Sequence, residues 1–263
     1  MGLGIGNANG NSFIKIPPGT PAPSFSNLYS MDFINANSEY LQGSGVPLLT
    51  QGSTGEWSFS VWVKVAALTS NNRRILAIGV GGTGGPGQTL FSINTSNSLQ
   101  ISGPFFHTYD WVTNAPGNGS TANIINNWIN VIYRVRTTPS GNNVGFVING
   151  TITNNKTKTV PTTYNDTGTF YIGRNAGGGY FDGSMDEVAI FNSYLSDAQC
   201  IELYNSGTPT DLSASSMAGV MQCWWRMGDP TGPSLYPTIP ATTGSITLTM
   251  NNMLSTNIQT DVP

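Results

Sequence analysis

Residues Gly168 to Gly207 read GTFYIGRNAGGGYFDGSMDEVAIFNSYLSDAQCIELYNSG, and this stretch contains several structural signals in succession. The run from Phe170 to Gly173 is aromatic and β-branched, which favours a strand. Gly177 to Gly179 follow it and permit a tight turn. A second strand is predicted from about Tyr180 to Phe191. Its alternation of apolar and polar residues slips at Glu187, which permits a β-bulge there.

A short helix is predicted after this second strand. Ser196 and Gln199 have the spacing of a capping box, and Gly207 is expected to end the helix. The apolar residues recur at the three- and four-residue spacing of a helix, at Leu195, Ala198, Ile201, Leu203 and Tyr204. The stretch therefore predicts strand, glycine turn, strand and short capped helix, in that order.

These residues resemble the C-terminal signature of laminin-G-like domains, which belong to the concanavalin A-like jelly-roll superfamily. In that signature an F-x-G-x-[ILM]-D-E-V-x-[IV]-[FY]-N strand precedes L-S-x-x-[EQ]-[IL]-x-x-L-Y. The matching positions here are Phe181, Gly183, Met185, Asp186, Glu187, Val188, Ile190, Phe191 and Asn192, then Leu195, Ser196, Gln199, Leu203 and Tyr204. The resemblance implies an all-β fold: a concanavalin A-like jelly-roll β-sandwich of two antiparallel sheets with one short C-terminal helix.

The resemblance extends upstream and covers roughly residues 28 to 207. Residues 31–41 look like the opening strand pair of the family, although Ile34 stands where glycine is usual. Residues 57–64 and 74–79 look like its next two strands. Residues 128–136 and 144–152 look like a strand and the hairpin that follows it. The Asn149-Gly150 pair in this hairpin favours a type I′ turn, because both central residues of that turn need a positive φ.

Length and composition favour one large domain. All-β sandwiches often reach this length of 263 residues as a single unit. Residues 1–27 are rich in Pro and Gly and are predicted to form an N-terminal arm, since prolines prevent regular strand pairing. Residues 28–227 are predicted to form the laminin-G-like jelly-roll domain. Residues 228–263 are expected to be a C-terminal extension that packs on the sandwich or pairs with it.

Charge and hydropathy exclude several classes of partner. Charged residues make up 9% of the chain and the net charge is −3, so no clustered basic surface for nucleic acid is expected. The first 20 residues have neither the basic nor the apolar region of a secretory signal peptide, and no long apolar run predicts membrane insertion. Polarity comes instead from Asn, Ser, Thr and Gly. Amides and hydroxyls suit sugar hydroxyls, but they also suit any β-rich surface.

The C-terminal segment adds a second resemblance, which is less specific than that of the fold. The runs WWRMGD at 224–229 and YPTI at 236–239 resemble the tails of laminin-G-like proteins encoded by tailed bacteriophages, particularly aquatic ones. This implies a non-enzymatic virion structural protein, serving as capsid decoration, head fibre or tail appendage. Its partners would be other virion proteins, further copies of the chain as a homo-oligomer, and carbohydrate of the host surface, and it would be located in the virion after assembly in the host cytoplasm. The alternative is a glycan-binding lectin module that recognises cell-surface polysaccharide.

The sequence contains two groups of candidate site residues, one for a metal and one for a glycan. Many family members hold Ca²⁺ through an aspartate of the D-E-V strand, which implies a calcium site at Asp186, with Asp32 and Asp182 as further candidate ligands. The alternative for the acidic pair Asp186 and Glu187 is hydrogen bonding to loop amides, or simple solvation. Aromatic planes stack on the C–H faces of sugars, which makes Trp111, Tyr109 and the neighbouring His107 candidate glycan contacts, unless they form an ordinary aromatic strand.

Enzymatic signatures are missing. His107 is the single histidine, no G-x-S-x-G motif accompanies it, and the E-x-D-x-E strand of jelly-roll glycosidases does not occur. Residues 79–84 satisfy G-x-G-x-x-G, but Gly85-Pro86-Gly87 follows in place of the helix that would hold a dinucleotide. Cys200 and Cys223 are expected to be free thiols, with a disulfide bridge as the alternative.

Overall fold

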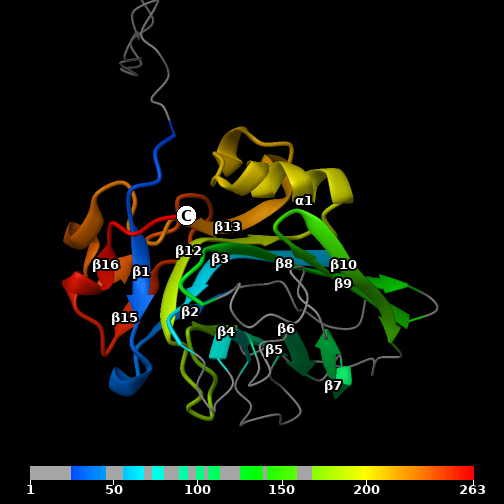
Figure 1. Ribbon diagram of the computed structural model, residues 1–263, viewed down its shortest axis with the longest axis horizontal. Helices are drawn as coiled ribbons and strands as arrows, with labels where there is room; N and C mark the ends of the chain where they lie inside the picture. Colours follow the sequence, from blue (N-terminus) through cyan, green and yellow to red (C-terminus); the bar gives the residue numbers. More distant parts are fainter. Residues whose placement is uncertain are drawn as a thin grey trace, which may run out of the picture.

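The computed structural model describes residues 25–45, 56–67, 73–79, 89–93, 99–103, 106–112, 125–138, 141–158 and 168–263. Side chains are described for all of these except 89, 101–112, 137–138, 141–144 and 153–158. The described strands form two stacked sheets, with one short helix lying over the outer face of the first sheet (Figure 1). No helix in these ranges is long and apolar enough to cross a membrane.

The first sheet, here called sheet A, has the strand order β10-β9-β8-β3-β12-β1-β16, and β13 also pairs with β12. All of these pairs are antiparallel. The strand bounds are β1 Ser30–Phe33, β3 Glu56–Val65, β8 Ile129–Thr138, β9 Gly141–Ile148, β10 Thr151–Lys158, β12 Gly183–Phe191, β13 Met221–Trp225 and β16 Ile258–Gln259.

The second sheet, sheet B, has the strand order β14-β15-β2-β11-β4-β5-β6-β7 and is also antiparallel. Its strand bounds are β2 Tyr40–Ser44, β4 Arg73–Ile78, β5 Thr89–Ile93, β6 Leu99–Gly103, β7 Phe106–Val112, β11 Thr169–Ile172, β14 Thr238–Ile239 and β15 Leu248–Asn251. Two antiparallel sheets with one short helix, α1 (Asp197–Tyr204), confirm the jelly-roll sandwich expected from the sequence.

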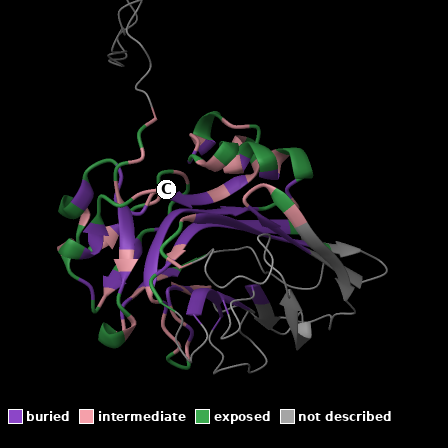
Figure 2. Ribbon diagram, in the orientation of Figure 1, coloured by how far each residue is buried: buried purple, intermediate pink, exposed green. Residues whose placement is uncertain are grey.

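The main core lies between the sheets. β3 sends alternate side chains into it, from Trp57 to Val65, while Trp62 points to the opposite face and stacks on Tyr204 of α1. β12 is buried along its whole length because its outer face also packs, under α1, in a second apolar cluster that contains Ala189 and Phe191 (Figure 2). β12 is therefore a central strand with two buried faces.

The expected bulge in β12 is confirmed. Pairing of β12 with β3 shifts register between Asp186 and Ala189, and Glu187 adopts a positive φ of 48°. Met185 faces the main core before the bulge, and Val188 faces it after the bulge. The extra residue therefore shifts the in-and-out alternation of the strand by one position. The strand itself begins at Gly183, not near Tyr180, because Tyr180 makes only an isolated bridge to Arg174.

Most of the local predictions for the helix and the hairpin are confirmed. Ser196 and Gln199 form the predicted reciprocal capping box at the start of α1. The helix ends at Tyr204 and not at Gly207, because Asn205 takes the left-handed conformation that caps it. Asn149 and Gly150 both have positive φ in the turn between β9 and β10, as a type I′ turn requires.

The two cysteines are free and buried on different sides of sheet A. Cys200 of α1 belongs to the outer apolar cluster, whereas Cys223 of β13 packs in the main core. The sheet separates the two thiols, which agrees with the expectation of free cysteines. Burial raises the pKa of each thiol to about 11.

Three short strands of the C-terminal segment pair with the sandwich. β14 and β15 extend sheet B beyond β2, and β16 pairs with β1 at an edge of sheet A. Ile239, Leu248 and Ile258 thereby enter the main core. β15 also places a row of polar side chains beside those of β2 on the outer face of sheet B.

Candidate functional site

The outer face of sheet B carries aligned polar and aromatic side chains on three neighbouring strands. On β2, Tyr40, Gln42 and Ser44 share this face because alternate residues of a strand point the same way. Residues directly opposite each other in paired strands also share a face. Gln42 is thus flanked by Tyr171 of β11 and Thr249 of β15, since both pair directly with it.

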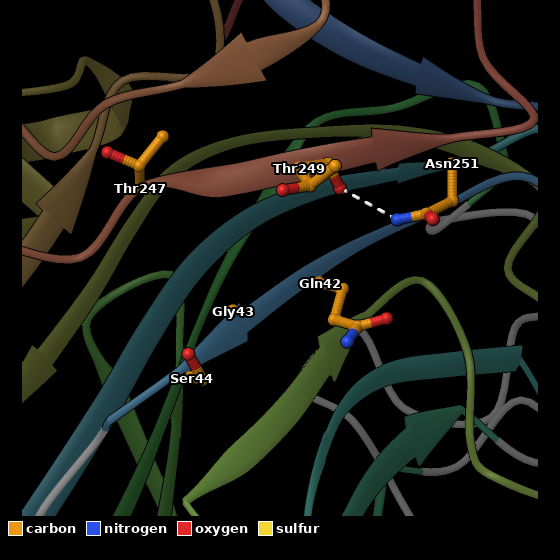
Figure 3. A pocket seen from close by; sticks show the side chains of 6 residues that line it. All are labelled: Gln42, Gly43, Ser44, Thr247, Thr249 and Asn251. Carbon is orange, nitrogen blue, oxygen red and sulfur yellow. Dashed lines mark hydrogen bonds between the residues drawn. The ribbon is translucent and has the colours of Figure 1, made fainter.

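The next rows continue this alignment. Asn251 of β15 lies opposite Tyr40, and Thr169 of β11 lies opposite Ser44. A depression of about 260 Å³ is lined by β2 and by the segment that contains β15, through Gln42, Gly43, Ser44, Thr247, Thr249 and Asn251 (Figure 3). We call this depression the amide groove. None of its lining residues is charged.

The shape of the amide groove depends on backbone contacts as well as on side chains. The side-chain amide of Asn251 donates to the carbonyl oxygen of Thr249 at 2.9 Å, which fixes the amide at one end of the groove (Figure 3). Gly43, which also lines the groove, leaves no room for a side chain, because a Cβ there would lie 2.3 Å from the Phe170 ring in the core. The groove therefore lies directly over the packed interior.

A cluster of three tyrosines and one arginine adjoins the amide groove. The guanidinium carbon of Arg174 lies 4.4 Å from the ring centre of Tyr40, 4.8 Å from that of Tyr171 and 5.8 Å from that of Tyr180. The rings of Tyr40 and Tyr171 meet edge to face, with 5.9 Å between their centres. All four side chains are half-buried, so each still reaches solvent. We call this group the tyrosine–arginine cluster.

The glycine turn holds Arg174 in place. Nε of Arg174 donates to the carbonyl oxygen of Asn175 at 2.9 Å, and Oδ1 of Asn175 accepts from the backbone N–H of Gly179 at 2.7 Å. The bridge between Arg174 and Tyr180 closes this turn. The glycines expected to form a turn therefore also position a cation beside the amide groove.

This combination of groups suits a ligand rich in hydroxyls. Amide and hydroxyl side chains donate and accept hydrogen bonds at the same site, and they stay fully solvated until a ligand replaces water. Ring faces of tyrosine supply apolar area with a polar tip. Sugars present hydroxyls at their edges and C–H groups on their faces, which matches both parts.

The glycan contacts predicted from the sequence lie elsewhere in sheet B. His107, Tyr109 and Trp111 belong to β7, the edge strand that β11, β4, β5 and β6 separate from β2. Trp111 pairs with Gln100 through its backbone. The side chains of β7 lie outside the described residues, so their contact with sugar stays a prediction.

The predicted calcium ligands fall into two groups, on sheet A or directly before its strand β12. Asp32 of β1 lies opposite Ser184 and accepts from its hydroxyl at 3.4 Å, and Asp182 accepts from the backbone N–H of Asn35 at 3.2 Å. Burial raises the pKa of Asp32, and repulsion by Glu39 and Asp182 adds to this rise. Asp182 and Asp32 are thus near enough to interact.

Asp186 belongs to a separate buried group. Its carboxylate is fully buried and accepts from Nδ2 of Asn27 at 2.9 Å and from the backbone N–H of Glu187 at 2.7 Å. Burial, with repulsion by Glu187 as the second cause, raises the pKa of Asp186 well above its ordinary value. The adjacent carboxylate of Asp229 contributes further repulsion.

Glu187, the residue after Asp186, is the second acid of this buried group. Its carboxylate accepts from Nε1 of Trp224 and from Nε of Arg226, the latter at 3.2 Å. Burial raises the pKa of Glu187 to about 7, against the opposing effect of the Arg226 charge. Phe25 stacks on Trp224, and its ring centre lies 4.4 Å from the Arg226 guanidinium carbon, so the first described residues of the chain cover these acids.

As placed, the Asp186 group does not fit a calcium ion. Calcium takes six to eight oxygen ligands, whereas the groups that contact the fully buried Asp186 carboxylate are N–H donors, from Asn27 and from Glu187. Among the described side chains, no group of three or more His, Cys, Asp or Glu residues is arranged to hold a metal. Calcium at Asp186 is thus supported by the family resemblance alone and stays an untested prediction.

Sequence patterns did not single out the residues of the amide groove. Alternation on Tyr40, Gln42 and Ser44, and again on Thr247, Thr249 and Asn251, is a signal that each strand has one polar face. The pairing of β2 with both β11 and β15 joins segments from distant parts of the chain. No local pattern predicts that pairing.

A sequence profile of the laminin-G type, described as the concanavalin A-like lectin/glucanases superfamily, matches residues 35–200, which is more than half of the chain. The chain belongs to the concanavalin A-like lectin/glucanases superfamily. This membership agrees with the family resemblance of the D-E-V strand and the two-sheet architecture. A search among curated proteins finds no match.

Solved structures share the superfamily's fold with this chain at low sequence identity. One is a protein from Bacteroides ovatus, provisionally assigned as carbohydrate-binding, with a TM-score of 0.62 and 20% identity over 90% of this chain and 60% of that one. This chain thus spans only part of that protein's length. Another is a native heptameric SAP-like pentraxin from Limulus polyphemus, with a TM-score of 0.52 and 11% identity over 88% of this chain and 100% of that one.

Proposed function

We propose that the protein is a glycan-binding module of the lectin type, and that the amide groove with its tyrosine–arginine cluster is the binding site. The observation that carries this proposal is the alignment of Tyr171, Gln42 and Thr249 across three adjacent strands on the outer face of sheet B. A sugar ring can stack on the tyrosine while its hydroxyls bond the amide and the threonine. Superfamily membership and the assignment of the Bacteroides ovatus protein support the proposal at the level of fold.

The proposal is for binding without turnover. Pairs of carboxylates that hydrolyse glycosidic bonds stand about 5 to 10 Å apart across the substrate. The groove lining contains no carboxylate at all. We therefore expect a bound polysaccharide to be released unchanged, which reducing-end analysis after prolonged incubation checks.

A glycan array followed by calorimetric titration tests the proposed function. The wild-type protein is expected to bind a subset of polysaccharides, and Tyr171→Ala and Gln42→Ala are expected to weaken that binding. Ile201→Ala is the control, because Ile201 is 56% exposed on α1 over the other sheet. Binding that survives both groove variants would place the site elsewhere, and a protein that binds no glycan would refute the proposal.

A virion role remains compatible with glycan binding. The resemblance of residues 224–239 to tails of phage-encoded proteins supports a structural protein of a tailed phage, and adhesion to host polysaccharide is one task of such a protein. Oligomerisation and contacts with other virion proteins belong to the same proposal. Mass spectrometry of purified particles tests it: abundant peptides of this chain are expected, and their absence would contradict the virion role.

A further inference from the structure

We propose that the amide groove selects acidic carbohydrate, and that the Arg174 guanidinium binds a carboxylate on the sugar. This inference rests on the proposed function, because it names the ligand class of the same site. It starts from a cation that is held beside a neutral groove without a carboxylate partner among the described residues.

The charge of Arg174 is not neutralised by the described side chains. Three other basic residues have acidic partners: Arg134 pairs with Asp197, Arg226 with Glu187 and Asp229, and Lys64 with Asp261. Within the described ranges, the hydrogen bond from Nε to Asn175 and the three tyrosine rings are the contacts of Arg174. Its two terminal nitrogens therefore retain donors that no described group uses.

Those donors are accessible. Arg174 is only half-buried. Several described side chains have buried polar atoms without a hydrogen-bond partner, but the two terminal nitrogens of Arg174 are not among them. A guanidinium packed on ring faces keeps its planar edge free, and that edge matches the two oxygens of a carboxylate. The tyrosines thus hold the cation while the edge remains available to a ligand.

The position of Arg174 couples the cation to the groove. Of the three tyrosine rings, that of Tyr40 is nearest to Arg174, and that of Tyr171 is second. Both tyrosines pair directly with residues of the groove lining, Tyr40 with Asn251 and Tyr171 with Gln42. A sugar whose hydroxyls bond these amides therefore has its edge beside the cation. Because the lining residues are uncharged, no acidic side chain of the groove repels an anionic ligand.

Preorganisation increases the benefit of this contact. A free arginine side chain loses rotamer entropy when it is ordered. Here three rings and one hydrogen bond already order Arg174 before any ligand arrives. A charge-assisted hydrogen bond contributes about twice as much as a neutral one. We therefore expect at least about 10-fold tighter binding of an acidic sugar than of its neutral counterpart.

Matched polysaccharides test the inference. The panel consists of polygalacturonate, alginate and hyaluronan, each compared with its carboxyl-reduced neutral form, in about 0.15 M salt to screen long-range attraction. Dextran sulfate and neutral dextran form a further pair that separates carboxylate from sulfate. The proteins are the full-length wild type, Arg174→Gln, Arg174→Lys and Arg136→Gln. Arg136 is the matched control, since it is exposed and lies 4.7 Å from the Tyr194 ring on sheet A.

The expected result is that at least one acidic form binds the wild type about 10-fold or more tightly than its reduced form. Arg174→Gln is expected to weaken binding of the acidic form more than binding of the neutral form, so that the difference between the two is abolished. Arg174→Lys is expected to restore part of the preference, because it keeps the charge without the planar edge. Arg136→Gln is expected to bind like the wild type.

Three results would overturn the inference. Equal affinity of every acidic form and its reduced form would show that charge is not selected, and a preference for dextran sulfate alone would show that the anion is not a carboxylate. A loss of neutral and acidic binding to the same degree in Arg174→Gln would show that Arg174 only supports the tyrosines. In each of these cases, the proposed function would still be supported if Tyr171→Ala weakened glycan binding. Failure of the wild type to bind any member of a glycan array would refute both.

Discussion

The guanidinium of Arg174 and the ring of Tyr40 are in contact, with 4.4 Å between the guanidinium carbon and the ring centre, although the two residues are far apart in the sequence. The antiparallel pairing of β2 with β11 brings them together, and the glycine turn after β11 returns the chain over the ring. The contact joins a cation to a groove of amides and hydroxyls. The proposed preference for acidic sugars rests on this contact.

Substitutions of Tyr40 separate the role of its ring from that of its hydroxyl. Tyr40→Ala removes the face on which Arg174 rests and the flank of the amide groove beside Asn251. We expect glycan affinity to fall by roughly 2- to 12-fold, which corresponds to a lost aromatic contact of about 0.5–1.5 kcal/mol. Tyr40→Phe keeps the ring and is expected to retain most of the affinity. Equal losses in the two variants, measured by calorimetric titration, would contradict a stacking role.

The buried acids predict that stability falls as pH rises. Burial raises the pKa of Glu187 from 4.5 to about 7, so the folded protein keeps a proton that the unfolded chain releases between these values. The stabilising contribution is fully present below about pH 4.5 and is lost as the pH rises through about 7. Asp186 acts in the same direction, because its pKa is also raised.

Denaturant unfolding at about pH 5 and about pH 8 measures this effect. Relative to Glu187→Gln, the wild type is expected to lose on the order of 2 kcal/mol of unfolding free energy across this range. The variant is the reference because its amide does not titrate and can still accept from Trp224. Parallel pH profiles of the two proteins would show that Glu187 titrates at an ordinary pKa.

Gly183 tests the start of β12. Its φ is +134°, and a Cβ at this position would lie 2.1 Å from the carbonyl oxygen of Lys64. Gly183→Ala is expected to lower the unfolding free energy by more than about 2 kcal/mol, through a backbone clash and an unfavourable φ. Gly219→Ala is the control, since nothing lies within 4 Å of an added Cβ there. Similar melting temperatures of the two variants would contradict the described pairing of β12 with β3.

Calcium titration decides whether Asp186 binds a metal. Because no group of three or more His, Cys, Asp or Glu side chains in the described residues is arranged to hold a metal, we expect the same melting temperature of the wild type in calcium and in a chelator. Asp186→Asn provides the second comparison, as its amide resembles the protonated acid in shape. A calcium-dependent rise in the wild type that Asp186→Asn abolishes would instead establish the metal site that the family resemblance implies.

Local sequence signals predicted the elements around β12 well. The capping box of Ser196 and Gln199, the Asn149-Gly150 turn and the bulge at Glu187 all depend on residues close together in the chain. The end of α1 was predicted less well, because Asn205 takes the left-handed conformation two residues before Gly207. Local patterns identify the residues that can end a helix, but not which of them does.

The candidate site was less predictable than the fold. Trp111 was predicted as a glycan contact because it lies in an aromatic run, whereas Tyr40 and Tyr171 stand singly in separate strands. They become a site only when β2 pairs with β11 and with β15. Likewise, Asp186 carries the family motif, but its burial under Asn27 depends on packing of the N-terminal segment, which the motif does not encode.

A structure of the protein in complex with the best ligand of the glycan array is the most direct test of the binding site. The sugar is expected on the outer face of sheet B, stacked on Tyr171 and hydrogen-bonded to Gln42, with a carboxylate at the guanidinium edge of Arg174. A sugar bound instead at β7 around Trp111, or on sheet A beside Asp186, would contradict the amide groove as the site of recognition.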